Sequence, residues 1–478
     1  MKVIRNYLYN TGYQVLALIV PLVTSYYVSR VLRPEGVGIN AFTNSIVQYF
    51  ILLANIGIGY YGNREIAYVR DSKEKLSQTF WEIQIIKTLT TLFSYSIFVI
   101  FMMVYTHNRI YMWAQSINLI SVAFDISWLY MGIEDFKRTV IRNILVKIIS
   151  TIAIFTFVRN ENDLALYIVL LACSSLFGNL TLWPYLKYIL SNKKNIFMKL
   201  KPWRHFIPCV MMFIPTIATQ LYVQLNRTML GVMVNETASG YYQYSDSLVK
   251  LILAFVTATG TVMMPHVSNA FANGDITRVN KMLYKSFDFV SAIAFPMSFG
   301  LAGISTTLSI LYYGKGYAPV GIALFIESIV IVLIGWSNVI GVQYLLPINK
   351  TKEFTASVTC GAIINIVLNI PLIKLWGLEG AMFSTVISEM GVTIYQLYIA
   401  RNLLDLYSLF KGSWKYLFSG IIMFIPVYLM NIKLSISWLF LILEVLVGIV
   451  IYAVMLLILK AEIIYSAKSI LEKYKNKN

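Results

Sequence analysis

Charged residues are scarce in this sequence. They make up 13% of its 478 residues, while 58% are hydrophobic, and soluble domains usually carry about 25% charged residues. This deficit excludes a soluble globular protein and predicts an integral membrane protein. The lead before the first apolar run carries only Lys2 and Arg5, and that run is longer than the apolar part of a signal peptide. We therefore expect the run to stay in the protein as a membrane helix.

Cysteine and histidine are also rare, with three of each. Cys173, Cys209 and Cys360 fall singly in apolar runs, so the sequence has neither a CxxC pair nor a secreted disulfide framework. We interpret them as packing residues. The histidines form no HExxH motif and no carboxylate cluster accompanies them. The sequence therefore predicts no metal site and no cofactor.

Apolar runs fill most of the chain and predict an all-α polytopic membrane protein with about 14 transmembrane helices, since about 20 residues suffice to cross a bilayer. No loop between these runs exceeds about 20 residues, which leaves no room for a folded catalytic domain outside the membrane. The predicted spans lie near 8–30, 36–60, 79–105, 110–131, 140–158, 163–188, 206–229, 239–264, 285–312, 318–342, 354–373, 378–400, 414–430 and 435–459.

The net charge of +17 is distributed unevenly over the loops. With a cytoplasmic start, 28 of the 39 lysines and arginines lie in inner loops, 7 in outer loops and four in spans. This asymmetry follows the positive-inside rule and predicts that both termini are cytoplasmic. We interpret the excess charge as a topology signal and as a contact with anionic membrane lipids, not as a nucleic-acid surface.

An internal repeat links two distant segments. Residues 38–48 recur as residues 240–250, and Pro21 in the preceding span has a counterpart in Pro215. Weak repeats of apolar segments are typical of secondary transporters, whose substrate path lies between the two halves. Chance similarity is the alternative, but the matching prolines favour a true duplication.

The spacing of the repeat predicts the domain organisation. An offset of about 200 residues carries six spans, so both copies enter the membrane in the same direction and the repeat is parallel. We expect an N-terminal lobe at 1–189, a basic cytoplasmic linker at 190–205 and a C-terminal lobe at 206–402. Two further helices and a basic cytoplasmic tail occupy 403–478.

Ionisable residues inside the spans are the first candidates for function, because each costs at least about 2.5–3.5 kcal/mol to insert. Lys250 lies ten residues after the outer end of its span at Gly240, near the middle of the bilayer at about 1.5 Å per residue. Asp246 lies one turn earlier, in the favourable order for an intrahelical ion pair. The pair either only neutralises itself or lines a cavity. We favour the cavity, because the matching Asn44 and Gln48 are uncharged.

Other embedded charges leave similar alternatives open. Asp125 lies at mid-depth with Lys147 on the next span as a plausible partner, in a structural or a coupling pair, and Lys87 is close enough to the inner face to reach it. Lone carboxylates at mid-span are either protonated or coupling-ion sites. These carboxylates are Glu327, Glu389 and Glu444.

Arginines and tyrosines near the span ends complete the candidate site. Arg30, Arg33 and Arg227 form an outer cationic ring or anchor helices at the interface, and Arg64 is an inner topology charge or a substrate contact. Most of the 33 tyrosines belong to the aromatic belts at the interfaces. Four of them flank the Arg227 and Lys250 cations and are candidates for sugar contacts. These four are Tyr222, Tyr241, Tyr242 and Tyr244.

Three segments resemble a known family. Residues 32–83, beginning LRPEGVG, residues 125–148, beginning DISWLYMGIEDFKR, and residues 224–251, beginning QLNRTMLG, resemble the Wzx-type polysaccharide repeat-unit flippases. These are bacterial members of the multidrug, oligosaccharidyl-lipid and polysaccharide exporter superfamily. The resemblance covers nearly the whole chain. It implies translocation of an undecaprenyl-diphosphate-linked oligosaccharide from the inner to the outer leaflet by alternating access between two six-helix lobes.

The resemblance also implies a site and partners. In the family the first, second, seventh and eighth spans border a cationic cavity, which puts Arg30, Arg64, Arg227 and Lys250 near the substrate diphosphate. Relatives often carry a carboxylate close to Asn226, which this chain lacks. A proton or sodium coupling ion and polysaccharide polymerase machinery are the further partners implied, in the bacterial cytoplasmic membrane.

Two rival functions stay open from sequence. Another exporter of the superfamily, such as a lipid II flippase or a multidrug antiporter, is the nearest; an antiporter predicts twelve spans and an acidic cavity. A membrane polysaccharide polymerase is the rival from another class, and it predicts a large outer loop that is absent here. A purely structural scaffold gives no reason to place Lys250 and Asp125 at mid-depth.

Overall fold

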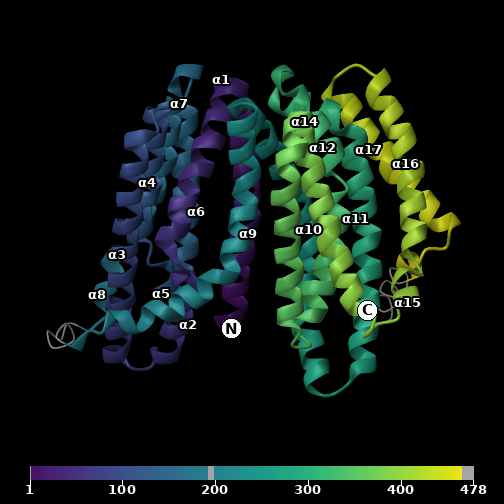
Figure 1. Ribbon diagram of the computed structural model, residues 1–478. Coiled ribbons are helices and arrows are strands. Elements are labelled where there is room, and N and C mark those ends of the chain that lie inside the picture. Colours follow the sequence, from purple (N-terminus) through teal and green to yellow (C-terminus); the bar gives the residue numbers. More distant parts are fainter. Residues whose placement is uncertain (1, 192–198, 466–478) are drawn as a thin grey trace. The chain divides into compact units, whose positions relative to one another are not determined.

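The computed structural model describes residues 2–191 and 199–465. Within these ranges, side chains are described except for residues 2–18, 214–219, 221–223 and 261–262. All regular secondary structure in the described ranges is helical, and Figure 1 shows the helices of each part of the chain running side by side. The predicted all-α polytopic fold is confirmed.

Two compact units divide the chain, Met1–Gly231 and Val232–Asn478. The helices of unit 1 are α1 Lys2–Asn55, α2 Ile58–Val69, α3 Lys73–Val104, α4 Arg109–Phe124, α5 Ser127–Gly132, α6 Phe136–Phe157, η1 Glu161–Asp163, α7 Leu164–Leu180, η2 Trp183–Tyr185, α8 Leu186–Ile189, η4 Pro202–His205 and α9 Phe206–Met233. Those of unit 2 are α10 Glu236–Ala272, α11 Ile276–Tyr313, η5 Lys315–Tyr317, α12 Ala318–Glu327, α13 Val330–Ser337, the π-helix η6 Asn338–Leu345, α14 Thr351–Ala400, α15 Leu406–Phe410, α16 Ser413–Lys433 and α17 Trp438–Ile458.

The number of spans agrees with the prediction once helix breaks are considered. Nine helices among the described residues are long and apolar enough to cross a membrane, and a bent pair, Lys315–Glu327 with Val330–Leu345, forms a tenth span if counted as one. Two of the nine, Ile19–Val69 and Thr351–Ala400, are long enough to cross twice and contain an internal break. The nine helices and the bent pair give ten spans, and counting the two long helices twice gives twelve. The helices α4 and α9, which coincide with two further predicted spans, bring the number of helical segments to the predicted fourteen.

Helix breaks recur at the offset of the sequence repeat. Inside α1, Arg33 adopts φ 56 and ψ 174, next to Pro34, which has no backbone N–H to continue the helix. The chain also breaks between α9 and α10, where Asn235 accepts a hydrogen bond from the Ala238 amide at 2.8 Å and caps α10. Arg33 and Asn235 are 202 positions apart (235 − 33), which is the offset between residues 38–48 and 240–250.

A stacked pair of one phenylalanine and one tryptophan is found in each unit. Phe80 on α3 and Trp128 on α5 have ring centroids 5.5 Å apart at an interplanar angle of 21°. Phe287 on α11 and Trp336 on α13 have centroids 5.4 Å apart, also at 21°. The partners are separated by 48 residues (128 − 80) and 49 residues (336 − 287). The two pairs are offset by 207 (287 − 80) and 208 (336 − 128) residues, close to the 202-residue offset of the sequence repeat, which supports a duplicated helical unit.

Each unit has its own core. In unit 1, a cluster around Phe80 and Trp128 joins α2, α3 and α5. In unit 2, α11 packs against α10, α12, α13, α16 and α17, so the two C-terminal helices are part of the packed unit. The predicted lobes 1–189 and 206–402 are defined by the internal repeat and not by packing. This division of the chain therefore remains a prediction.

Candidate functional site

The partner of Asp125 is Lys87, and the prediction that Lys147 pairs with it is wrong. The Lys87 ammonium lies 3.5 Å from Asp125 Oδ2 and donates to the Asp125 carbonyl oxygen at 2.6 Å. Lys87 is 0% exposed, so it does not reach the inner face as its position suggested. Asp125 ends α4, and its Oδ1 accepts from the Ser127 amide at 3.0 Å. Lys87 therefore binds both the free carbonyl and the carboxylate at a broken helix, which indicates a structural role.

Lys250 and Asp246 form the intrahelical ion pair that the sequence predicts. The Lys250 ammonium donates to Asp246 Oδ2 at 2.7 Å. The Lys250 side chain is 50% exposed, whereas that of Asp246 is 10% exposed. The lysine of this pair is therefore accessible, whereas Lys87 in the pair with Asp125 is buried. Its role in binding substrate stays a prediction.

The predicted arginines have different surroundings. Arg30 is exposed and lies over the Tyr26 ring, 3.7 Å from its centroid. Arg64 on α2 is also exposed and pairs with the neighbouring Glu65 at 3.0 Å. Arg227 is half-buried on α9, and Arg33 is paired with Glu161 at 3.0 Å. Arg33 thus ties the break in α1 to η1, which supports an anchoring role for this residue.

Three of the four candidate tyrosines pack within unit 2. Tyr244 is buried and stacks on Tyr313 at 4.2 Å and 7°. The Tyr241 hydroxyl donates to the Gly316 carbonyl at 3.0 Å, and the Tyr242 hydroxyl lies 3.3 Å from Thr385 Oγ1. These contacts join α10 to its neighbours, and a sugar contact by these rings stays a prediction. Tyr222, on α9, lies outside the described side chains.

The mid-span carboxylates have polar neighbours. Glu327 at the end of α12 is buried and accepts a hydrogen bond from Ser245 Oγ at 2.6 Å. Glu444 on α17 accepts from Asn431 Nδ2 at 2.8 Å, and Glu389 is half-buried on α14. Ion coupling by Glu327 and Glu389 stays a prediction. Among the described residues, no group of three His, Cys, Asp or Glu is placed to hold a metal ion.

A buried network at the start of α9 was not foreseen from sequence. Glu82 on α3 is 0% exposed, and its two oxygens accept from the Arg204 guanidinium at 2.6 Å, from His205 Nε2 at 2.8 Å and from the Lys201 amide at 2.7 Å. His205 Nδ1 lies 2.6 Å from the Tyr61 hydroxyl on α2. The two ring nitrogens of His205 thus bridge Glu82 on α3 and Tyr61 on α2. The network fastens η4 to α2 and α3.

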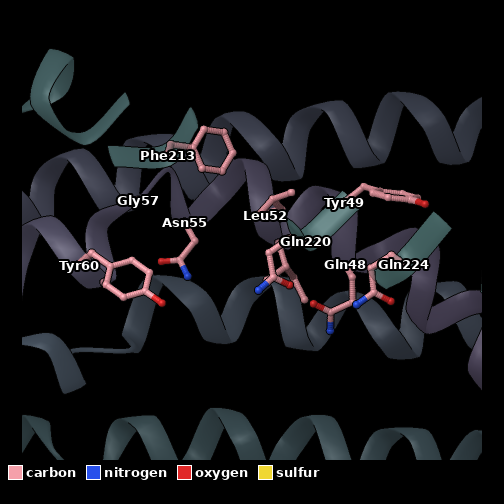
Figure 2. Close-up of a pocket in the computed structure, with 11 residues that line it drawn as sticks. Gln48, Tyr49, Leu52, Asn55, Gly57, Tyr60, Phe213, Gln220 and Gln224 are labelled. Atoms are coloured by element: carbon pink, nitrogen blue, oxygen red, sulfur yellow. The ribbon is translucent and has the colours of Figure 1, made fainter. Parts of the chain in front are cut away.

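A polar cavity of about 230 Å³ lies in unit 1 between the end of α1, the start of α2 and α9. Figure 2 shows the side chains of Gln48, Gln220 and Gln224 gathered in one part of it, with Asn55 and Tyr60 farther along. The described residues that line the cavity include no Asp, Glu, Lys, Arg or His. The lining residues are Gln48, Tyr49, Ile51, Leu52, Asn55, Gly57, Gly59, Tyr60, Phe213, Gln220 and Gln224.

The spacing of the amides explains how the sequence forms this cavity. Gln48, Leu52 and Asn55 follow one another at i, i+4 and i+7 on α1, and Gln220 and Gln224 are separated by four residues on α9, so each set shares one helix face. An amide buried without a partner is costly, so such stripes in apolar spans indicate a polar cavity. This signal is present in the sequence, but it consists of uncharged amides and is weaker than the signal of an embedded charge.

Gly57 allows α9 to lie close to the turn between α1 and α2. Its φ is 76, and a Cβ there would lie 2.6 Å from the Cys209 carbonyl oxygen and 2.9 Å from the Phe213 amide nitrogen. Both contacts are backbone atoms of α9, which cannot move aside as a side chain can. The absence of a side chain at Gly57 therefore sets the distance between two walls of the cavity.

Comparisons with known proteins agree with this architecture. A family model described as "Polysaccharide biosynthesis protein" matches residues 3–271. A protein of Escherichia coli (strain K12) named "Putative O-antigen transporter" is 24% identical over 407 residues, which is 83% of this chain and 96% of that protein.

Solved structures show the same fold at low identity. "Lipid II flippase MurJ, inward closed conformation" superposes with a TM-score of 0.72 at 16% identity, over 94% of this chain and 98% of that one. An inward-facing "multidrug resistance MATE family transporter of the MOP superfamily" has a TM-score of 0.64 at 14% identity, over 82% of this chain and 95% of that one. These likenesses establish the fold.

Proposed function

This chain belongs to the polysaccharide biosynthesis protein family, and from that membership we infer that it moves an undecaprenyl-diphosphate-linked oligosaccharide repeat unit from the inner to the outer leaflet of the bacterial cytoplasmic membrane. It is a multi-pass membrane transporter rather than an enzyme, as are the proteins that it resembles, a putative O-antigen transporter, a lipid II flippase and a multidrug resistance transporter. Movement occurs by alternating access, in which two lobes tilt around a fixed site. The translocated repeat unit is then used for the synthesis of a surface polysaccharide.

The substrate sets three chemical requirements. A diphosphate needs fixed cations in a water-poor site, where charge-assisted hydrogen bonds are strong. Its sugars need polar and aromatic walls, and its lipid tail needs access from the bilayer. Cations inside the spans and the polar cavity of unit 1 meet the first two requirements, and a helical transporter fold is suited to the third.

The observation that carries the proposal is the half-exposed side chain of Lys250 within a membrane-spanning helix. An ammonium has three N–H donors, and one of them is directed to Asp246. The other two are suited to phosphate oxygens. An ion pair that served only to neutralise itself would not require an exposed lysine side chain. Arg30, Arg64 and Arg227 are the further cations proposed for the diphosphate.

Alanine substitutions of these cations test the proposal. We expect Lys250→Ala or Arg227→Ala to abolish surface polysaccharide while the protein stays in the membrane at normal abundance, because the diphosphate loses a fixed positive charge. Lys250→Arg is the matched control and should retain part of the export, since it keeps the charge. Polysaccharide is measured on the cell surface and the protein by immunoblot of membranes. Normal export by both alanine variants would contradict the assignment.

A further inference from the structure

We propose that the polar cavity of unit 1 binds one uncharged sugar ring of the transported oligosaccharide and discriminates against acidic sugars. The proposal rests on the function inferred above, and it concerns the choice among substrates rather than transport itself. It is carried by the chemistry of the side chains that line the cavity. Four of them are carboxamides and two are phenols, Tyr49 and Tyr60.

Unpartnered acceptors favour a ligand that donates hydrogen bonds. Asn55 Oδ1 and Gln224 Oε1 are both buried, and neither has a hydrogen-bond partner among the described residues. Buried oxygens of this kind are costly to leave unpaired. Because these oxygens have almost no accessible surface, a sugar hydroxyl pairs with them once the amide turns toward the cavity, whereas an ionised carboxylate or phosphate only accepts. The carboxamides therefore match a neutral hydroxyl-rich ring better than an anion.

The absence of charge from the described lining supports the same choice. A uronic acid or a phosphate placed here would lose water without gaining a cation among these residues. The nearest cations along α2 and α9 are Arg64, four residues beyond Tyr60, and Arg227, three residues beyond Gln224; both lie outside this lining and are proposed for the diphosphate. Carboxamides offer both donors and acceptors, as do sugar hydroxyls.

The size and the aromatic residues of the cavity limit its ligand to about one ring. Its volume of about 230 Å³ corresponds to roughly eight water molecules at about 30 Å³ each. The Tyr49 hydroxyl lies 3.0 Å from Thr228 Oγ1, which lies 2.9 Å from Ser45 Oγ, so this tyrosine is held in place. The Tyr60 ring is 70% exposed and is available to stack on the apolar face of a sugar.

Binding by the full-length protein in nanodiscs tests the proposal. The probes are undecaprenyl diphosphate, the same lipid linked to glucose, and the same lipid linked to glucuronic acid, with affinity measured by thermophoresis. We expect glucose to tighten binding about tenfold relative to the sugar-free lipid, since a few well-placed hydrogen bonds supply such a gain. Glucuronic acid should give no gain.

Substitutions that place a negative charge in the cavity should remove the gain from glucose. Gln220→Glu and Gln224→Glu are expected to bind the glucose lipid no more tightly than the sugar-free lipid, because a carboxylate adds charge and loses two N–H donors. Gln243→Glu on α10 of unit 2, outside the cavity, is the matched control and should keep the gain. Thermal unfolding of the purified variants verifies that each is folded.

The outcomes separate this proposal from the function on which it rests. If the wild type binds the sugar-free lipid and Lys250→Ala does not, but glucose adds nothing, the cavity assignment is overturned and the transport proposal stands. Equal tightening by glucuronic acid, or an unchanged gain in folded Gln220→Glu and Gln224→Glu variants, also overturns it. If the wild type binds none of the three lipids, both proposals fail.

Discussion

Embedded ionisable residues differ in how far they are exposed, and this difference separates structural groups from candidate functional groups. Lys87 and Glu82 are fully buried, and each binds several polar atoms at the end or break of a helix. Lys250 keeps half of its side chain exposed beside Asp246. Because inserting a charge is expensive, a buried charge with saturated partners serves folding. An exposed charge within a span is the better candidate for binding.

Removing Lys87 should therefore destabilise the protein. Lys87→Met leaves the Asp125 carboxylate without its cation and the end of α4 without a donor. Breaking a fully buried pair costs roughly 3–5 kcal/mol, and the cost here is smaller because the Asp125 side chain is 33% exposed. We expect a clear fall in the melting temperature of the purified protein, with partial recovery in the double variant Lys87→Met with Asp125→Asn. Lys75→Met, at an exposed position of the same helix, is the control and should change stability little. A larger loss from Lys75→Met than from Lys87→Met would contradict this assignment.

At the scale of helices, breaks position the polar groups. The end of α4 at Asp125, the break at Arg33 and the turn at Gly57 each leave backbone groups outside a regular helix, and such groups must find partners or line a cavity within a membrane. Lys87 binds the carbonyl oxygen at the end of α4, and the Arg33 side chain ties the break in α1 to Glu161. The turn at Gly57 borders the polar cavity.

Gly57→Ala tests the close approach of α9. A Cβ at Gly57 would meet two backbone atoms of α9 within 3 Å, in addition to the roughly 1–2 kcal/mol cost of a left-handed conformation. We expect a lower melting temperature and reduced export. Gly274→Ala is the matched control, because Gly274 has φ 73 and no atom within 4 Å of an added Cβ. It should show only the conformational cost. Equal effects of the two substitutions would argue against a clash with α9.

Glu82→Gln tests the attachment of η4. The substitution removes the anion that binds Arg204, His205 and the Lys201 amide. We expect trypsin to cleave the purified protein faster after Lys199 and Arg204, because this segment is no longer fastened to α3. Cleavage sites are identified by mass spectrometry. Glu65→Gln, which alters only the exposed pair with Arg64, is the control, and an unchanged cleavage rate in Glu82→Gln would show that the network does not fasten η4.

At the scale of the whole molecule, two observations support duplication beyond the sequence repeat. The break at Arg33 and the break at Asn235 share the 202-residue offset, and a Phe–Trp stack recurs with nearly the same geometry in each unit. Such agreement between sequence and structure is typical of transporters built from two repeats. It does not require identical chemistry, since Gln48 lines a neutral cavity and its counterpart Lys250 carries a charge.

The predicted orientation of the chain is testable with single cysteines. The loop between α10 and α11 and the loop between α16 and α17 lie at opposite ends of unit 2 (Figure 1). In a protein with Cys173, Cys209 and Cys360 replaced, we expect Asn273→Cys to react only with reagents that reach the cytoplasm and Ser435→Cys with impermeant reagents added outside. This pattern places both termini inside, as the positive-inside rule predicts. The reverse labelling pattern would contradict it.

The sequence by itself determined the membrane class, the helical fold, the approximate number of spans and the Asp246–Lys250 pair. These follow from composition, from apolar length and from spacing within one helix, which act along the chain. Only the tertiary structure decided that Lys87 binds Asp125, that Glu82 holds the start of α9, and that amides from α1 and α9 enclose one cavity. Those contacts join different helices, and they depend on how each helix is rotated and where it breaks, which spacing along one helix does not specify.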